Sequence, residues 1–292
     1  MAQGPIFLPD GEVARGLNFQ QLLSRAIADM AATGYTSRDR IEDWVVLLRN
    51  AAERELGSDA DIDGILSRSL GAQFRRLIDN GRVVNFVPNV KPFNIEMIRP
   101  QLRAELDRRV LAAADLIKLR RKDAVEETLA RLIGWSTSIP PGGDGTIDKR
   151  ETRAAIGKSV AQFKYERRRV EIDQAHKLIA NINAIVATDA GAIAGTWHSH
   201  GEHDASYHAR EDHLERVGKI YLIRDSWAHR DGLVKSVDGY TDEITAPGQE
   251  VFCRCWLTYF TSPRQLPDQM LTRKGQEWVE RGRLERQRRM AA

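Results

Sequence analysis

The chain has 292 residues, with 44 Lys and Arg against 41 Asp and Glu, and its 42% hydrophobic and 29% charged residues are typical of a globular protein of one or two domains. Its two cysteines are one residue apart, which excludes a secreted disulfide scaffold, and it contains no run of about 18 apolar residues that would predict a membrane span. Its first ten residues lack the pattern of an export signal, and a net charge of +3 predicts no general affinity for nucleic acid or for an anionic membrane.

The first 95 residues are predicted to form a helical region. Apolar residues recur at intervals of three and four from 17 to 32, from 41 to 52 and from 62 to 77, which is the pattern of helices with one buried face. Ser37 is placed to cap the second helix, and a glycine follows each helix, at positions 34, 57 and 81. Three such helices predict a bundle.

The middle of the chain is predicted to be helical apart from two interruptions. Residues 83–100 hold three prolines, which predicts a linker or short extended segment. One helix is then predicted from Gln101 through Ile117, and a further helix up to Trp135. Two prolines and three glycines in 139–145 predict a loop, and apolar residues recurring every seven positions from 165 to 186 predict a long helix.

The pattern changes after Ala194. Residues 219–224 and 250–260 are rich in β-branched and aromatic residues, which predicts two strands of a small sheet. The predicted fold class is α+β, mainly α-helical in the N-terminal two-thirds, with a small C-terminal antiparallel β-containing subdomain. The predicted domains are a helical region at 1–95, helices followed by the small sheet at 96–262, and a basic helical tail on the surface at 263–292.

Cys253 and Cys255 are the first candidate site. On a strand, residues two apart lie on the same face, so both thiols would point together and suit one soft metal ion such as a structural zinc. His213 is a candidate further ligand if the fold brings it near. The alternative is that the two cysteines are small, half-buried core residues without a metal.

The histidine-rich segment is the second candidate site. His198 and His200, with one residue between them, could chelate a catalytic metal, with Glu202 or Glu211 as the base. The pair is similar to the His-x-His motif of zinc isopeptidases of the JAMM type, although Gly201 stands where that family has proline. A zinc-dependent hydrolase is therefore one alternative function, and a polar loop of titrating histidines is the structural alternative.

The third candidate site is a basic stretch from Lys149 to Arg169. The tail from 273 to 289 is a second basic stretch. Clustered Lys and Arg attract phosphate backbones without reading sequence, so a nonspecific DNA-binding protein is a further alternative function. The competing interpretation is a solvated helix face. The candidate DNA contacts are Arg150, Arg153, Lys158, Lys164, Arg167, Arg168 and Arg169.

Read together, the C-terminal motifs resemble the signature of phage minor head proteins of the Mu F-like head morphogenesis family. The residues that carry the resemblance follow Trp197 and are Arg210, Asp212, His213, Cys253, Arg254 and Cys255. The similarity covers about residues 100 to 260 and is strongest from 197 to 256.

The resemblance implies a structural rather than an enzymatic role. It implies a low-copy protein of the virion head, associated with the portal, incorporated during head assembly and able to contact packaged double-stranded DNA. It also implies that the signature residues have a structural role in forming and stabilising the fold. Arg210 or Arg254 would then pair with Asp212 or Glu243, and the thiols would pack together or bind a structural metal.

Overall fold

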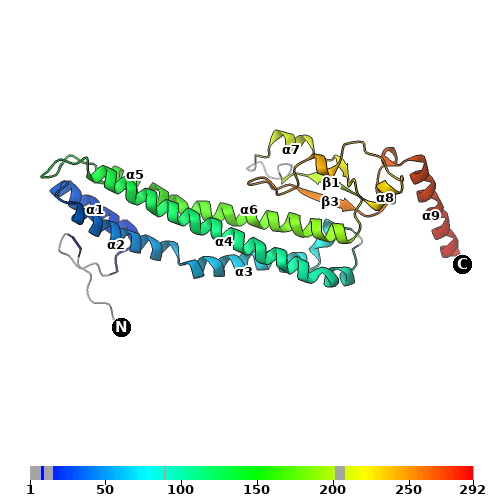
Figure 1. The fold of residues 1–292 in the computed structure, drawn as a ribbon, viewed down its shortest axis with the longest axis horizontal. Coiled ribbons are helices and arrows are strands. Elements are labelled where there is room, and N and C mark those ends of the chain that lie inside the picture. The colour runs from blue at the N-terminus through cyan, green and yellow to red at the C-terminus, as the bar shows by residue number, and fades with distance from the viewer. Residues whose placement is uncertain (1–7, 10–15, 89, 201–207, 292) are drawn as a thin grey trace. The chain divides into compact units, whose positions relative to one another are not determined.

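The computed structural model describes residues 8–9, 16–88, 90–200 and 208–291 (Figure 1). The chain divides into two compact units. Unit 1 comprises residues 1–65 and 112–170, and unit 2 comprises residues 66–111 and 171–292. The predicted divisions at residues 95 and 262 do not coincide with these units, because each boundary between the units falls inside a long helix.

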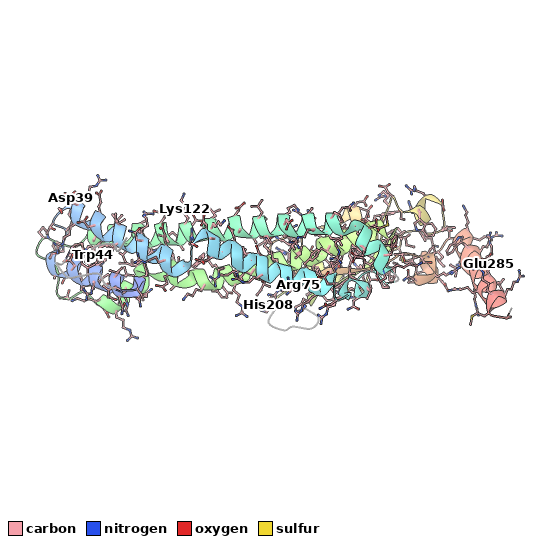
Figure 2. All side chains as sticks on the ribbon, turned by 90° about the horizontal axis from the view of Figure 1, so that it is seen from below. Asp39, Trp44, Arg75, Lys122, His208 and Glu285 are labelled. Atoms are coloured by element: carbon pink, nitrogen blue, oxygen red, sulfur yellow. The ribbon has the colours of Figure 1, made fainter. Side chains whose placement is uncertain are left out.

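The described part of unit 1 is helical and follows the predicted pattern at its start. Helix α1 (Phe19–Thr33) is capped by Asn18 and ends at Gly34, and α2 (Arg38–Leu56) is capped by Ser37 as predicted. The third predicted helix is α3 (Asp59–Leu77). Figure 2 shows the side chains of this unit, in which Trp44 is buried and Lys122 is exposed.

The segment 83–100 is not the predicted linker. A short 3-10 helix, η1 (Arg82–Asn85), is followed by α4 (Pro92–Ser136), one continuous helix of 45 residues where two separate helices were predicted. Pro92 stands at its first position, where a missing N–H costs nothing. Pro100 lies inside the helix and removes only one backbone bond, while Ile98 and Leu102 on either side of it are buried.

The predicted loop and long helix are both present. Residues 137–148 form no regular element, and they are followed by α5 (Lys149–Ile156) and by α6 (Lys158–Asp189). In unit 1 the loop lies against the end of α1, since the Asp144 N–H donates to the Ala31 carbonyl at 2.8 Å. Gly143 adopts a φ of +83° at this close approach, which favours glycine.

Unit 2 contains the predicted small antiparallel sheet, with three strands in the order β2-β1-β3. The strands are β1 (Ala194–His198), β2 (Ile220–Leu222) and β3 (Trp256–Phe260). The central strand β1 was not predicted, because its alanine and glycine are weak strand formers. Residues 250–255 form a turn and an irregular segment, so only the second half of the predicted strand 250–260 is a strand.

Short elements lie between the strands and after the last strand, and a helix follows them. They are α7 (Glu211–Glu215), α8 (Trp227–Arg230), η3 (Thr241–Glu243), η4 (Pro263–Gln265), η5 (Asp268–Met270) and α9 (Arg273–Ala291). The predicted basic tail is α9, and its first half is anchored rather than free, because Trp278 and Val279 pack against the apolar cluster around Leu222 and Met270. Residues 283–291 are exposed and extend away from the sheet in Figure 1.

No described helix combines the length and the apolar character needed to cross a bilayer.

Candidate metal centre

The two cysteines lie just before β3, and the turn that begins near Gly248 places them. Because they precede the strand, strand alternation does not bring their thiols together, which corrects the predicted reason for their proximity. The Cys253 N–H donates to the Glu250 carbonyl at 3.2 Å and closes the turn. Phe252, inside the turn, has a φ of +60° and is the one non-glycine residue with positive φ in the described part of the chain.

His213 completes a three-residue cluster from a different element. It lies on α7, and its Nδ1 is 3.5 Å from the Cys255 sulfur and 3.7 Å from the Cys253 sulfur. All three side chains are buried, and their potential ligand atoms lie within 4.8 Å of one another. This is the metal set predicted from the sequence, and it is the one group of its kind among the described residues.

The distances in the cluster match those around a tetrahedral metal ion. Zinc bonds of about 2.3 Å to sulfur and about 2.05 Å to nitrogen separate a sulfur from a nitrogen ligand by about 3.6 Å in tetrahedral geometry. The observed separations of 3.5 and 3.7 Å fall on either side of that value. The imidazole nitrogen is therefore spaced from each sulfur as in a tetrahedral site, and the cluster could hold one metal ion.

The two thiols do not share the same proton affinity. The pKa of Cys253 is lowered to about 6, first by the hydrogen bond with the Cys255 side chain and further by the backbone N–H groups of Cys255 and Gly248. The pKa of Cys255 is raised, first by that same bond with Cys253 and then by burial. Because metal ions bind thiolates, the lowered pKa of Cys253 favours this sulfur as a ligand, and binding of a cation would release the proton of Cys255.

The outer nitrogen of His213 faces a carboxylate. His213 Nε2 lies 3.5 Å from Glu250 Oε2 and 3.8 Å from Asp212 Oδ2. Arg210 Nη1 in turn pairs with Glu250 Oε2 at 2.8 Å, and its Nη2 donates to the Val251 carbonyl. If Nε2 carries the proton, it faces Glu250, and the lone pair of Nδ1 is directed toward the sulfurs. Metal-binding histidines commonly have such a carboxylate at their outer nitrogen.

The partners of the signature arginines differ from those predicted. Arg210 pairs with neither Asp212 nor Glu243, because Asp212 pairs with Arg216 at 2.6 Å and Glu243 pairs with Arg224 at 2.6 Å.

Arg254 lies between the two cysteines in the sequence. Its charge reaches His176 on α6, where burial first and then Arg254 lower the pKa of the imidazole to about 4.

Strand β1 forms the wall behind the cluster. The Trp197 ring meets the His213 ring edge to face, with centroids 5.4 Å apart, and both side chains are buried. The Trp197 indole and the buried Ser199 hydroxyl lie against the Cys255 sulfur, where each favours its thiolate. Sequence analysis placed Trp197 in the family signature but missed Ser199 and Glu250, for which the sequence offers no local signal.

The other histidines that the structure describes lie outside the cluster. His198 stacks on Trp256, its cross-strand partner, with ring centroids 5.4 Å apart. His200 lies 6.1 Å from the His176 ring, and His208 is exposed. Of the two predicted bases, Glu211 is exposed at the start of α7, and Glu202 falls outside the described residues. No group of three or more potential metal ligands among the described residues includes His198 or His200.

The predicted DNA contacts lie on α5 and α6 in unit 1. Arg150, Lys158, Lys164, Arg168 and Arg169 are exposed.

Two of the predicted contacts are partly covered. Arg153 and Arg167 are only half-buried, and Arg153 donates to the Ser24 hydroxyl at 3.0 Å.

Compared with known proteins, the chain matches no family model, no curated protein and no solved structure.

Replacing Glu250 tests the outer shell of the cluster. We expect Glu250→Ala to weaken binding of a divalent ion about tenfold, because His213 loses the carboxylate that orients its ring. The matched control is Asp212→Ala, which removes the more distant, exposed carboxylate that already pairs with Arg216. Titration with Co²⁺, followed by its sulfur-to-metal absorption, measures both affinities, and equal losses would assign Glu250 no special role.

Proposed function

We propose that the chain is a structural minor head protein of a tailed bacteriophage, associated with the portal and taking part in head assembly. The observation that carries the proposal is the convergence of the signature in space. His213 lies 40 residues before Cys253 in the sequence, yet its Nδ1 lies 3.7 Å from that sulfur, and Arg210 joins the same cluster through Glu250. Three members of the signature, His213, Cys253 and Cys255, form one buried cluster, which fits residues that hold a fold together.

The proposed ion in the cluster is zinc. Two thiolates and an imidazole form a ligand set that suits zinc, and Cys253, Cys255 and His213 would hold it. The ion would tie α7 to the segment before β3 and would supply structural stabilisation rather than chemistry. Burial of all three ligands supports this structural role, since a catalytic zinc needs a position open to substrate.

The alternative of a zinc hydrolase has less support. Its proposed ligands, His198 and His200, both lie beside the Trp256 ring, and neither belongs to a group of three metal-ligating side chains among the described residues.

A second candidate function, contact with DNA, is favoured by the charges of unit 1. Lys149, Arg150, Lys158, Lys164 and Arg168 are exposed, and none of them forms an ion pair with a described acidic residue. Some arginines elsewhere, such as Arg99 and Arg121, form ion pairs with acidic residues. A run of uncompensated cations attracts the phosphate backbone of double-stranded DNA without reading its sequence. We propose that this surface contacts packaged DNA.

An aromatic side chain lies within this charged surface. Tyr165 is 65% exposed, and the Arg169 guanidinium carbon lies 5.6 Å from the centre of its ring. On α6 the positions 158, 165, 168 and 169 fall on one face of the helix. The surface therefore combines cations with a ring that can pack against a sugar or base edge.

The proposal that the chain is a minor head protein is tested on purified phage heads. Purified heads of the phage that encodes this chain should contain it in far fewer copies than the coat protein, and the portal protein should co-purify with it. Quantitative mass spectrometry of the heads measures the copy number. Heads that lack the protein would overturn the assignment as a virion component.

The zinc assignment is tested on the purified chain. One zinc per chain is expected, and chelation should lower the thermal midpoint because the ion links two elements of unit 2. His213→Ala should lose the zinc, whereas the matched change His208→Ala, at an exposed histidine outside the cluster, should retain it. Elemental analysis gives the stoichiometry, and a clearly substoichiometric content in the wild type would reject the zinc.

The DNA surface is tested by reversing its charges. Five phosphate contacts predict that log K falls with log salt with a slope of about −4.5. The triple change Lys158→Glu, Lys164→Glu and Arg168→Glu should lower affinity for duplex DNA and flatten this slope.

A matched control separates this surface from net charge. The triple change Arg54→Glu, Arg120→Glu and Lys122→Glu alters the charge of unit 1 equally, at exposed positions outside the surface. Equal losses in both variants would show that net charge alone is responsible, and absence of binding at low salt would remove the proposed contact.

A further inference from the structure

The turn before β3 contains a backbone conformation that needs support. Phe252 has a φ of +60°, a left-handed value that is strained for a bulky side chain. Its side chain is 36% exposed, so burial alone does not hold it in place. Cys253 follows directly, which means that any relaxation of Phe252 would move the first of the two thiols.

A carboxylate on α6 holds this conformation. The Phe252 N–H donates to Asp173 Oδ1 at 2.7 Å, a contact between residues 79 positions apart in the chain. A charged acceptor forms a stronger bond to a backbone N–H than a neutral acceptor does. Asp173 belongs to unit 2, as do the turn and the metal cluster.

Both carboxylate oxygens of Asp173 accept hydrogen bonds. It is 5% exposed, and its Oδ2 accepts from Lys177 Nζ at 3.0 Å and from Gln174 Nε2 at 3.2 Å. A buried carboxylate is costly unless it is paired, and here the pairing occupies Oδ2 while Oδ1 is left for the turn. The arrangement directs one oxygen of a buried charge at one backbone amide.

The other end of the turn lies on the same face of α6. A Cβ at Gly248 would meet the Ala180 side chain and the Lys177 backbone, each at 3.3 Å. Positions 173, 177 and 180 follow the i, i+4, i+7 spacing of a single helix face. The turn is therefore docked on α6 at two points, one polar and one of close packing, with Cys253 bonded to the Gly248 N–H at 3.4 Å.

We infer that Asp173 is a positioning residue of the metal cluster, which fixes the spacing of the two thiols by holding the Phe252 turn on α6. The inference rests on the proposed metal site and adds to it a residue that no motif indicates. Asp173 touches neither sulfur nor His213 among the described contacts, so it acts through the backbone of the turn.

Metal affinity of variants tests the inference. Asp173→Ala should weaken Zn²⁺ and Co²⁺ binding 10- to 100-fold, as is typical when an outer partner of a ligand is removed. Asp173→Asn keeps an oxygen acceptor for the Phe252 N–H and should remain close to wild type. Glu105→Ala is the matched control, because Glu105 is a similarly buried and paired carboxylate of unit 2 that does not contact the turn.

A double-mutant cycle separates positioning from loss of stability. Glycine adopts a positive φ without strain, so in a Phe252→Gly background the effect of Asp173→Ala on affinity should shrink. An equal effect in both backgrounds would contradict the inference. So would Asp173→Ala with wild-type affinity, or Glu105→Ala with the same loss as Asp173→Ala.

A measurement without metal separates this inference from the zinc proposal. In the chelator-treated chain, hydrogen exchange at the Phe252 amide should accelerate at least tenfold in Asp173→Ala, while amides of β1 remain protected. If the wild type binds neither ion, the zinc proposal fails, yet faster exchange at Phe252 still shows that Asp173 holds the turn. Unchanged exchange there overturns the role of Asp173 itself.

Discussion

The C-terminal unit depends on the hydrogen bond from the Phe252 N–H to the buried carboxylate of Asp173. This bond keeps a strained residue in a left-handed conformation, and the strained residue in turn places Cys253 beside Cys255. His213 approaches the two sulfurs from α7, with its outer nitrogen toward Glu250. A ligand set is thus assembled from segments that are distant in sequence, and the contact that orders it lies outside the ligands.

The small size of the sheet explains why such a cluster is useful. Its strands have five, three and five residues, and strands this short provide little independent stability. One apolar cluster, around Leu222 and Met270, lies near one end of β1, where Ala194 belongs to it. Trp197 near the other end packs against His213. The proposed metal ion would therefore stabilise the part of the sheet that this apolar cluster does not reach.

The nearly neutral net charge hides a division between the two units. In unit 2, cations close to the proposed metal site form ion pairs, as Arg210 does with Glu250 and Arg216 does with Asp212. In unit 1 five cations between 149 and 168 are exposed and lack such partners among the described acids. Because paired charges cancel at short range while unpaired ones add, this part of unit 1 presents a field suited to a polyanion. The proposed structural site and the proposed DNA surface therefore belong to different units.

The sequence by itself determined what is local. Caps such as Ser37, the glycines after the first helices and the apolar periodicity give the helices, because these signals act within a few residues. It also identified the three ligands as residue types that suit one metal. Only the tertiary structure decided that 92–136 is one helix, that β1 is the central strand, that Cys253 lies in a turn and that Arg210 pairs with Glu250. Each of these depends on a partner far along the chain, as Phe252 depends on Asp173, and local propensity carries no information about such a partner.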